Sequence, residues 1–269
     1  MLDFRHPLLQ VHAHRPWPLP QRPWALQQRW DRLLFAHWRV APAAVQRLLP
    51  QGLQVDLFAG AAYVAVVPFV LQIRARWAPP LPTAYRFPEI NVRTYVTDGC
   101  TPGVWFFSLD AASRLAVFGA RRLFHLPYFH AAIDFEARGE RAEYHARRSD
   151  GRAVFRAAYG PRGEAFRPTP GSLEHFLTER YCLYAAGPRE TLWRGDVHHR
   201  PWTLRPAWAE IRENSMAEAA GLVLEGDPLL HDAESLQVIA WPLSRAPGVE
   251  SHLDRGPAAR VPTYCPDGA

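Results

Sequence analysis

Short apolar runs, rich in β-branched and aromatic residues and bounded by Gly, Pro or Asp, dominate the chain from residue 53 onward. This pattern is typical of β-strands. Gly-containing turns separate the three middle runs, which predicts an antiparallel meander there. The predicted strands cover residues 53–58, 61–69, 89–97 and 103–110, then 131–137, 142–148 and 153–159, and finally 180–185, 192–199 and 236–243.

Helical signals are few and short. The segment 41–52 predicts a short helix that begins near Pro42 and is stopped by Pro50 and Gly52. The segment 171–180 predicts another, with Ser172 as its N-cap. No internal repeat or linker divides the sequence. We therefore expect a β-rich α+β protein, with short helices covering a large sheet or barrel. Its expected parts are an extended Pro-rich arm (1–23), a single domain (24–246) and a flexible tail (247–269).

Composition narrows the functional classes. The 269 residues include no lysine, so all 31 basic residues are arginines, and the net charge is +5. These arginines are spread along the chain among acidic residues, which argues against nucleic-acid binding, since that function needs a local basic surface. The sequence has no apolar run of about 18 residues, so we predict no membrane span. The first residues lack a signal-peptide pattern. We expect a cytoplasmic protein. Cys100, Cys182 and Cys265 stand at long spacings, which favours reduced thiols.

The predicted strand at 89–97 carries polar side chains at alternate positions. Glu89, Asn91, Arg93 and Tyr95 share one face, because successive side chains on a strand point to opposite faces. Polar side chains within an apolar strand are costly to bury unless they are paired or have a functional role. Two interpretations stay open: the face lines a polar cavity, or it forms an internal ion-pair network.

Residues 120–133, "ARRLFHLPYFHAAI", concentrate Arg121, Arg122, His125, Tyr128 and His130. His125 and His130 are five residues apart with Pro127 between them, which suits neither helical nor strand spacing for metal ligands. We predict no metal site and no cofactor, and metal binding through His37, His125 or His198 is only a weaker hypothesis. The sequence contains no GxSxG, P-loop or GxGxxG motif.

Several motifs together resemble a known family. The strings "RWDRLLFAHW", "LLPQGLQVD", "FPEINVRTYV", "GVWFFSLDA" and "FLTERYCLY" are similar to those of the YqjF-like family of uncharacterised bacterial proteins, over about residues 24 to 242. That family in turn resembles the acetoacetate decarboxylase superfamily. The resemblance implies a double-sheet, barrel-like domain with a buried pocket.

The same resemblance implies a modified active site. Superfamily enzymes form a Schiff base through a lysine, in a motif that falls on "GARRLFHLPYF" here, with Arg121 at the conserved arginine and Tyr128 and Phe129 at the lysine pair. A phenol cannot form an imine, and no other lysine exists to replace it. Lysine-imine decarboxylation is therefore excluded. Glu89 corresponds to the pocket glutamate and Arg29 to a substrate-side arginine, so Glu89, Arg93, Arg121 and Tyr128 are expected to converge in one cavity.

The leading hypothesis is a protein that binds a small carboxylate or keto compound in an arginine-lined cavity of about 300 Å³ or more. An enzyme of this kind would be a lyase, isomerase or hydrolase that uses acid–base chemistry. The alternative is a non-catalytic structural or interaction protein in which Glu89 and Arg121 pair internally. Partners are a small-molecule ligand and, by the resemblance, a homo-oligomer, with no nucleic acid and no membrane. The predicted site residues are Glu89 and Tyr128 for acid–base catalysis, and Arg29, Asn91, Arg93, Arg121 and His125 for ligand binding.

Overall fold

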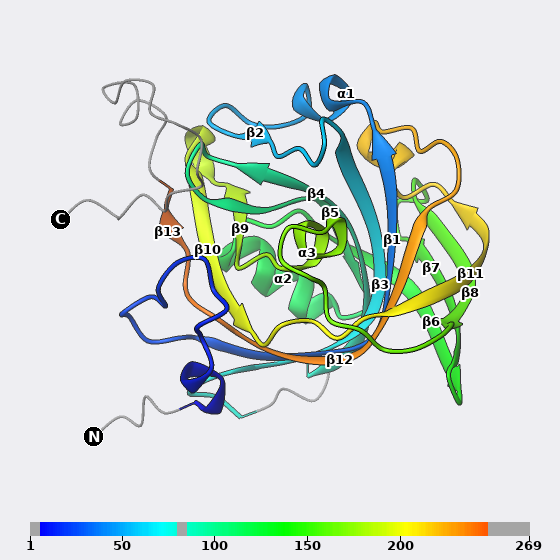
Figure 1. The fold of residues 1–269 in the computed structure, drawn as a ribbon, viewed down its shortest axis with the longest axis horizontal. Helices are drawn as coiled ribbons and strands as arrows, with labels where there is room; N and C mark the ends of the chain where they lie inside the picture. Colours follow the sequence, from blue (N-terminus) through cyan, green and yellow to red (C-terminus); the bar gives the residue numbers. More distant parts are fainter. Residues whose placement is uncertain (1–5, 80–84, 247–269) are drawn as a thin grey trace.

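The structure is a computed structural model that describes residues 6–79 and 85–246. β-Strands make up most of it, as the apolar pattern predicts (Figure 1). The strands are β1 (Leu26–Val40), β2 (Gln54–Val55), β3 (Ala62–Ala75), β4 (Arg86–Thr97), β5 (Pro102–Ala111), β6 (Tyr128–Arg138), β7 (Arg141–Arg148), β8 (Val154–Pro161), β9 (Cys182–Ala186), β10 (Leu192–His199), β11 (Arg205–Asn214), β12 (Leu229–Ala240) and β13 (Ser244–Arg245). The helices are α1 (Pro42–Gln46), α2 (Arg114–Leu123) and α3 (Leu173–Thr178), with short 3₁₀ turns at Pro7–Gln10, Pro188–Glu190 and Glu218–Ala220.

Strand pairing closes the sheet on itself twice. A first ring runs β5–β4–β3–β1–β12–β10–β9 and returns to β5 through a parallel pairing of β5 with β9. A second ring uses β5, β6, β7, β8, β11 and β12 and then shares β1, β3 and β4 with the first. In Figure 1, β6, β7, β8 and β11 lie on one side of the shared strands, and β9 and β10 lie on the other. This confirms the expected β-rich, barrel-like fold, including the antiparallel meander β6–β7–β8.

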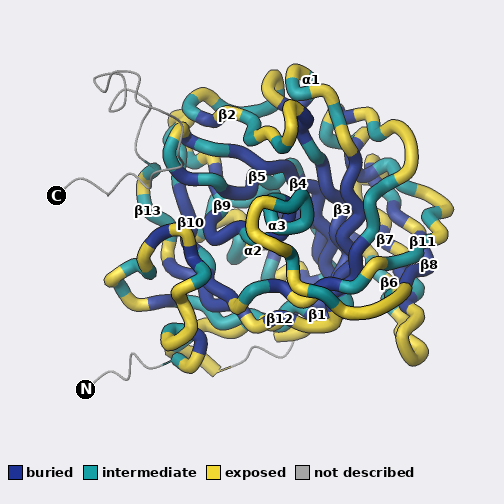
Figure 2. The backbone as a smooth tube through the Cα atoms, viewed as in Figure 1, coloured by how far each residue is buried: buried dark blue, intermediate teal, exposed yellow. Residues whose placement is uncertain are grey.

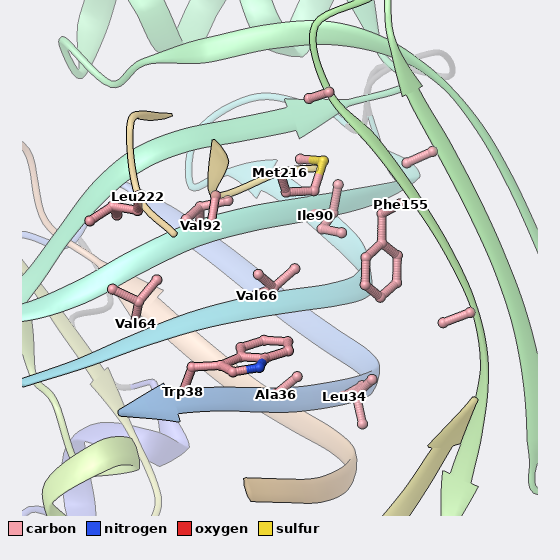
Figure 3. Packing of buried hydrophobic residues seen from close by; sticks show 14 of the residues in the cluster. Leu34, Ala36, Trp38, Val64, Val66, Ile90, Val92, Phe155, Met216 and Leu222 are labelled. Carbon is pink, nitrogen blue, oxygen red and sulfur yellow. The ribbon is translucent and has the colours of Figure 1, made fainter. Parts of the chain in front are cut away.

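The shared strands bury both of their faces. On β3, Val64 and Val66 face the second ring, whereas Val67 and Phe69 face the first. Figure 3 shows the second-ring side, where Trp38 and Phe155 pack with aliphatic residues from β1, β3 and β4. The dark trace of β3 and β4 in Figure 2 reflects this two-sided burial. The second ring is thus filled by an apolar core, which leaves the first ring as the place for a site.

A β-bulge in β1 decides which of its residues face the first ring. The pairing register with β3 shifts between Asp31 and Ala36, and Arg32 has a left-handed φ of 57°. A bulge adds one unpaired residue and so exchanges the two faces of a strand. Before it, Gln28 and Trp30 face the first ring, and after it Leu33 does.

Helices α2 and α3 are capped by serine side chains. The Ser172 side chain accepts a hydrogen bond from the His175 backbone N at 3.2 Å, which confirms the predicted cap of α3. Pro42 begins α1 as predicted. Helix α2 was not predicted, although Ser113 caps it by accepting a hydrogen bond from the Ala116 backbone N at 3.2 Å. A Ser followed by a periodic apolar run is a recognisable signal for the start of a helix. It was missed because residues 120–133, which overlap the end of the helix, were interpreted only as a candidate site.

The Pro-rich arm packs against the first ring. The Arg15 guanidinium donates a hydrogen bond to the Val197 carbonyl on β10 at 2.6 Å, and its carbon lies 4.9 Å from the centre of the Tyr181 ring. Trp17 is buried in a hydrophobic cluster that also contains Tyr181. The predicted tail, 247–269, lies outside the described residues. No helix within the described ranges is long and apolar enough to span a membrane.

Candidate functional site

The first ring contains a cavity of about 440 Å³, called here the central cavity. Strands of the ring supply most of its walls, and α2, Tyr128 of β6, the end of α3 and several loop residues contribute the rest. Most of the lining is aliphatic or aromatic. Its buried polar side chains are Glu89, Asn91, Arg93, Thr178, Arg180, Asp196 and His199.

Strand β4 delivers the polar row of the cavity. Glu89, Asn91 and Arg93 all line it, while Ile90 and Val92 between them pack into the core of the second ring. Figure 3 shows these last two side chains on the core side. The alternation read from the sequence therefore holds in the structure. The next residue of the row, Tyr95, is fully buried and hydrogen bonds through its hydroxyl to His37 Nε2 at 2.6 Å.

Glu89 and Tyr128 form a buried pair. The Tyr128 hydroxyl donates a hydrogen bond to Glu89 Oε2 at 2.9 Å. Burial raises the pKa of Glu89 to about 8, the Tyr128 hydrogen bond opposes that rise, and the nearby Asp110 carboxylate adds to it. The pKa of Tyr128 is also raised well above its usual value, first by burial. Glu89 is therefore mostly a neutral acid at pH 7, and it can donate a proton into the cavity.

The two buried arginines of the cavity differ in how they are held. Arg180 donates to Asp56 Oδ2 at 2.6 Å and to the Phe176 carbonyl at 2.7 Å. Arg93, by contrast, forms no ion pair with any residue in 6–79 or 85–246; its guanidinium hydrogen bonds with the Tyr95 side chain, while its Nε has no hydrogen-bond partner. Its guanidinium carbon lies 5.2 Å from the centre of the Phe35 ring. An uncompensated buried cation is costly, so this group suits an anionic ligand.

Asn91 adds a second unsatisfied group beside Arg93. Its Oδ1 is buried without a hydrogen-bond partner. Buried polar atoms in folded proteins are nearly always bonded to protein or water. The row on β4 therefore presents an acid, an amide and a guanidinium with unused hydrogen-bonding capacity.

Sequence reasoning missed several members of the lining. Arg180, Asp196, His199 and Trp202 come from segments far from β4 in sequence. His199 Nδ1 lies 2.8 Å from the Arg200 carbonyl and its ring stacks on Tyr181 at 4.7 Å, and burial lowers its pKa. Its Nε2 lies 3.3 Å from the Arg180 carbonyl, so both ring nitrogens face carbonyl oxygens, and burial outweighs these two contacts in setting the direction of the pKa. The available signal was the pair His198–His199 on a predicted strand, of which at most one member could face a pocket.

Arg121 and His125 lie elsewhere. Arg121 is exposed on the last turn of α2, and both residues line a separate hollow of about 400 Å³ beside the central cavity, the side pocket. His125 has a left-handed φ of 50°. The expected convergence of Arg121 with Glu89, Arg93 and Tyr128 is therefore wrong. Helix α2 turns the Arg121 side chain outward, away from the strand face that Tyr128 occupies.

Arg29 also lies outside the central cavity. Its side chain is about half exposed and pairs with Asp31 Oδ1 at 2.7 Å. The cavity-facing neighbours on β1 are Gln28 and Trp30, so Arg29 lies on the opposite face of the strand. The expected substrate-side role of Arg29 does not agree with this placement.

The expected internal network between Glu89 and Arg121 is not found, because Glu89 bonds to Tyr128 and Arg121 is exposed. A buried ion pair does exist behind the site. Arg148 donates to Asp110 through Nε at 2.5 Å and Nη2 at 2.8 Å, and its guanidinium covers the Phe129 ring at 4.0 Å. Phe129, which stands at the second lysine position that the superfamily resemblance implies, thus faces away from the cavity.

The histidines and cysteines of the described residues do not gather into a cluster of three or more potential metal ligands. His37 contacts Tyr95, His125 lies at the side pocket, and His198 Nε2 lies 2.9 Å from the Leu8 carbonyl. Cys182 is a buried free thiol, as expected. Cys100 is disulfide-bonded, so the expectation of a reduced thiol is wrong at that position.

Comparison with solved structures places the fold among acetoacetate decarboxylase-like enzymes. The enzyme from Sphingomonas wittichii RW1 superposes with a TM-score of 0.59 at 16% identity, covering 83% of this chain and 93% of that one. The enduracididine biosynthesis enzyme MppR, complexed with pyruvate, gives a TM-score of 0.62 at 14% identity, covering 84% and 91%. Acetoacetate decarboxylase from Legionella pneumophila gives 0.56 at 11%, covering 88% and 94%. These identities establish a shared fold alone.

Sequence comparison is more specific. Residues 27–237 match the DUF2071 family model, described as an uncharacterized conserved protein. The chain is also 45% identical over 230 residues to the uncharacterized protein YqjF of Bacillus subtilis (strain 168), a match that spans 84% of this chain and 95% of the relative. The chain therefore belongs to the DUF2071 family of uncharacterized conserved proteins and has an acetoacetate decarboxylase-like fold.

Proposed function

We propose that the central cavity binds a small keto or carboxylic acid, with Arg93 as the anion anchor and Glu89 as the proton donor. The observation that carries this proposal is the buried guanidinium of Arg93, which has no ion-pair partner in the described residues and lines an apolar cavity of about 440 Å³. A ligand carboxylate would supply the missing charge through hydrogen bonds to the guanidinium fork. The cavity volume is ordinary for a small-molecule site.

Glu89 fits the same ligand class because it is largely protonated at neutral pH. Its pKa of about 8 lets it donate a hydrogen bond to a carbonyl or carboxyl oxygen without repelling the anion that Arg93 holds. Tyr128 keeps the carboxyl oriented through the bond to Oε2. The chemistry that this pair supports is proton transfer at, or next to, a carbonyl group.

Two observations shape the reaction. The chain has no lysine, so it cannot activate a keto acid through a lysine imine. The structural neighbour MppR has been seen with pyruvate and with a condensation product of pyruvate and imidazole 4-carboxaldehyde. Keto acids are therefore the first ligands to test, with acid–base rather than covalent chemistry.

A thermal-shift screen with pyruvate, acetoacetate and other small carboxylates tests the proposal on four proteins: wild type, Arg93→Met, Glu89→Gln and Arg121→Ala. The last is a matched control, since it removes an exposed arginine outside the central cavity. A ligand at about 100 times its dissociation constant stabilises the native state by about 2.7 kcal/mol. We expect that shift in wild type and Arg121→Ala and its loss in Arg93→Met. No shift with any acid, or an equal shift in Arg93→Met, would overturn the proposal.

A further inference from the structure

We propose that the ligand of the central cavity is an acid with an extended apolar chain, whose head lies at Glu89 and Arg93 and whose chain leaves the protein along helix α2. This inference rests on the function proposed above and specifies its substrate class. It follows from the order of groups along the cavity and from the place where the lining reaches the surface.

The ladder between β3 and β4 gives that order. Arg93 pairs with Ala65, Asn91 with Val67, Glu89 with Phe69, and Phe87 with Leu71. Beyond Leu71, β3 continues through Ile73 to Ala75, and both of these line the cavity too. The polar row therefore occupies one end of the strand pair, and an apolar stretch separates it from the end of β3.

The far end is where the lining becomes exposed. The exposed residues that line the cavity come from two segments only, within the described part of the chain: the end of β3 with its following turn, and helix α2. They are Arg74, Ala75, Ala78, Pro79, Leu115 and Leu123. We infer that the cavity opens between these segments. Phe69, opposite Glu89, is six residues from Ala75, a span of about 20 Å along an extended strand.

Helix α2 exposes large apolar side chains at this opening. Leu115 is 47% exposed and Leu123 is 71% exposed, although both contribute to the cavity wall. Large apolar residues that are exposed beside an apolar cavity mark a binding surface. An apolar chain that runs from the cavity would cover both leucines and continue the contacts made inside by Leu71 and Phe87.

The same helix provides a control. Phe118 is 65% exposed, yet it does not line the central cavity. A ligand chain leaving the cavity would contact Leu115 and Leu123 but not Phe118. A macromolecule docked on the outer face of the helix would contact Phe118 as well.

Binding of straight-chain keto acids of increasing length tests the inference by calorimetry. The series runs from pyruvate through ketohexanoate and ketooctanoate to ketodecanoate. We expect affinity to rise about fourfold per buried methylene, equivalent to about 0.8 kcal/mol. Leu123→Ser and Leu115→Ser should flatten this rise for the longest acids. Phe118→Ser should behave as wild type.

Three results would overturn the inference. Equal affinity for all chain lengths would show that the apolar stretch is not used, while the proposed function still stood. A loss of long-chain affinity in Phe118→Ser equal to that in Leu123→Ser would indicate contact with the outer helix face instead. Failure of every acid to bind wild type would reject the proposed function itself, and this inference with it.

Discussion

The Tyr128 hydroxyl lies 2.9 Å from Glu89 Oε2, and both side chains are buried at the wall of the central cavity. The pair joins a strand shared by both rings to a strand of the second ring alone, since Glu89 is on β4 and Tyr128 begins β6. Tyr128 stands where the superfamily resemblance implies a lysine. The phenol therefore keeps a polar contact at that position, while the amine that forms an imine is absent.

Tyr128→Phe should raise the pKa of Glu89 above its value of about 8. The phenol donates to the carboxylate and so favours the ionised form, and phenylalanine removes that donor while keeping the ring. Infrared titration of the protonated carboxyl band, assigned by its absence in Glu89→Gln, measures the change. A pKa that stayed the same or fell would show that the hydrogen bond does not stabilise the carboxylate.

Glu89 should make the protein less stable as the pH rises from about 4.5 to about 8. Its folded pKa is raised from 4.5 to about 8, so within that window the folded state binds one proton more than the unfolded state. The free energy of unfolding then falls by about 1.4 kcal/mol per pH unit, and it levels off above the folded pKa. Urea unfolding of wild type and Glu89→Gln across this range measures the contribution.

The difference between the two proteins isolates Glu89 from opposing groups. Burial lowers the pKa of His37 and of His198, the latter to about 4, so these residues make stability rise with pH up to about 6.5. Both are present in wild type and variant, and their effects cancel in the difference. If the stability gap between Glu89→Gln and wild type did not widen in favour of the variant toward pH 8, the raised pKa would be wrong.

Residue patterns predicted the fold and the polar row of the site, because strand geometry is periodic. On β4, the alternation of Glu89, Asn91 and Arg93 with Ile90 and Val92 follows directly from the period of two. The strands themselves follow from runs of β-branched and aromatic residues between turn residues. Although β4 is buried on both faces, its polar row could be recognised in the sequence, because the charged residues are surrounded by apolar ones.

The remaining site residues depend on features that no local pattern encodes. The bulge near Arg32 exchanges the faces of β1, so Arg29 lies outside while Gln28 and Trp30 line the cavity. Helix α2 ends before Tyr128 and directs Arg121 to the surface. His199 joins the site only because β10 pairs with β9 and β12, a long-range arrangement. A one-residue error in register is enough to move a side chain to the other face.

Breaking the buried pair between Asp110 and Arg148 should destabilise the protein strongly. Arg148→Met leaves the Asp110 carboxylate buried without its two hydrogen bonds, which costs about 3–5 kcal/mol. The double variant Asp110→Asn, Arg148→Met should lose less than the sum of the two single variants, because no uncompensated charge remains. Urea unfolding of the complete cycle measures the coupling.

The exposed pair of Arg138 with Glu136, at 3.1 Å, is the matched control for that cycle. Its side chains are largely exposed, so Arg138→Met should change the free energy of unfolding by no more than about 0.5 kcal/mol. Equal losses in Arg148→Met and Arg138→Met would show that burial does not determine the strength of the inner pair.

Ala59→Asn should stabilise the tight turn that leads into β3. The backbone N–H of Phe58 donates to the Ala61 carbonyl, and the backbone N–H of Ala61 donates to the Phe58 carbonyl. The two residues between them, Ala59 and Gly60, have left-handed φ angles of 48° and 77°. Alanine in this region costs about 1 kcal/mol, whereas Asn-Gly is the preferred pair for such a turn. Gly60→Ala should lower stability by a similar amount through backbone strain alone, because no atom lies within 4 Å of an added Cβ. Thermal unfolding of both variants checks the opposite signs, and a shift of the same sign in both would contradict the turn geometry.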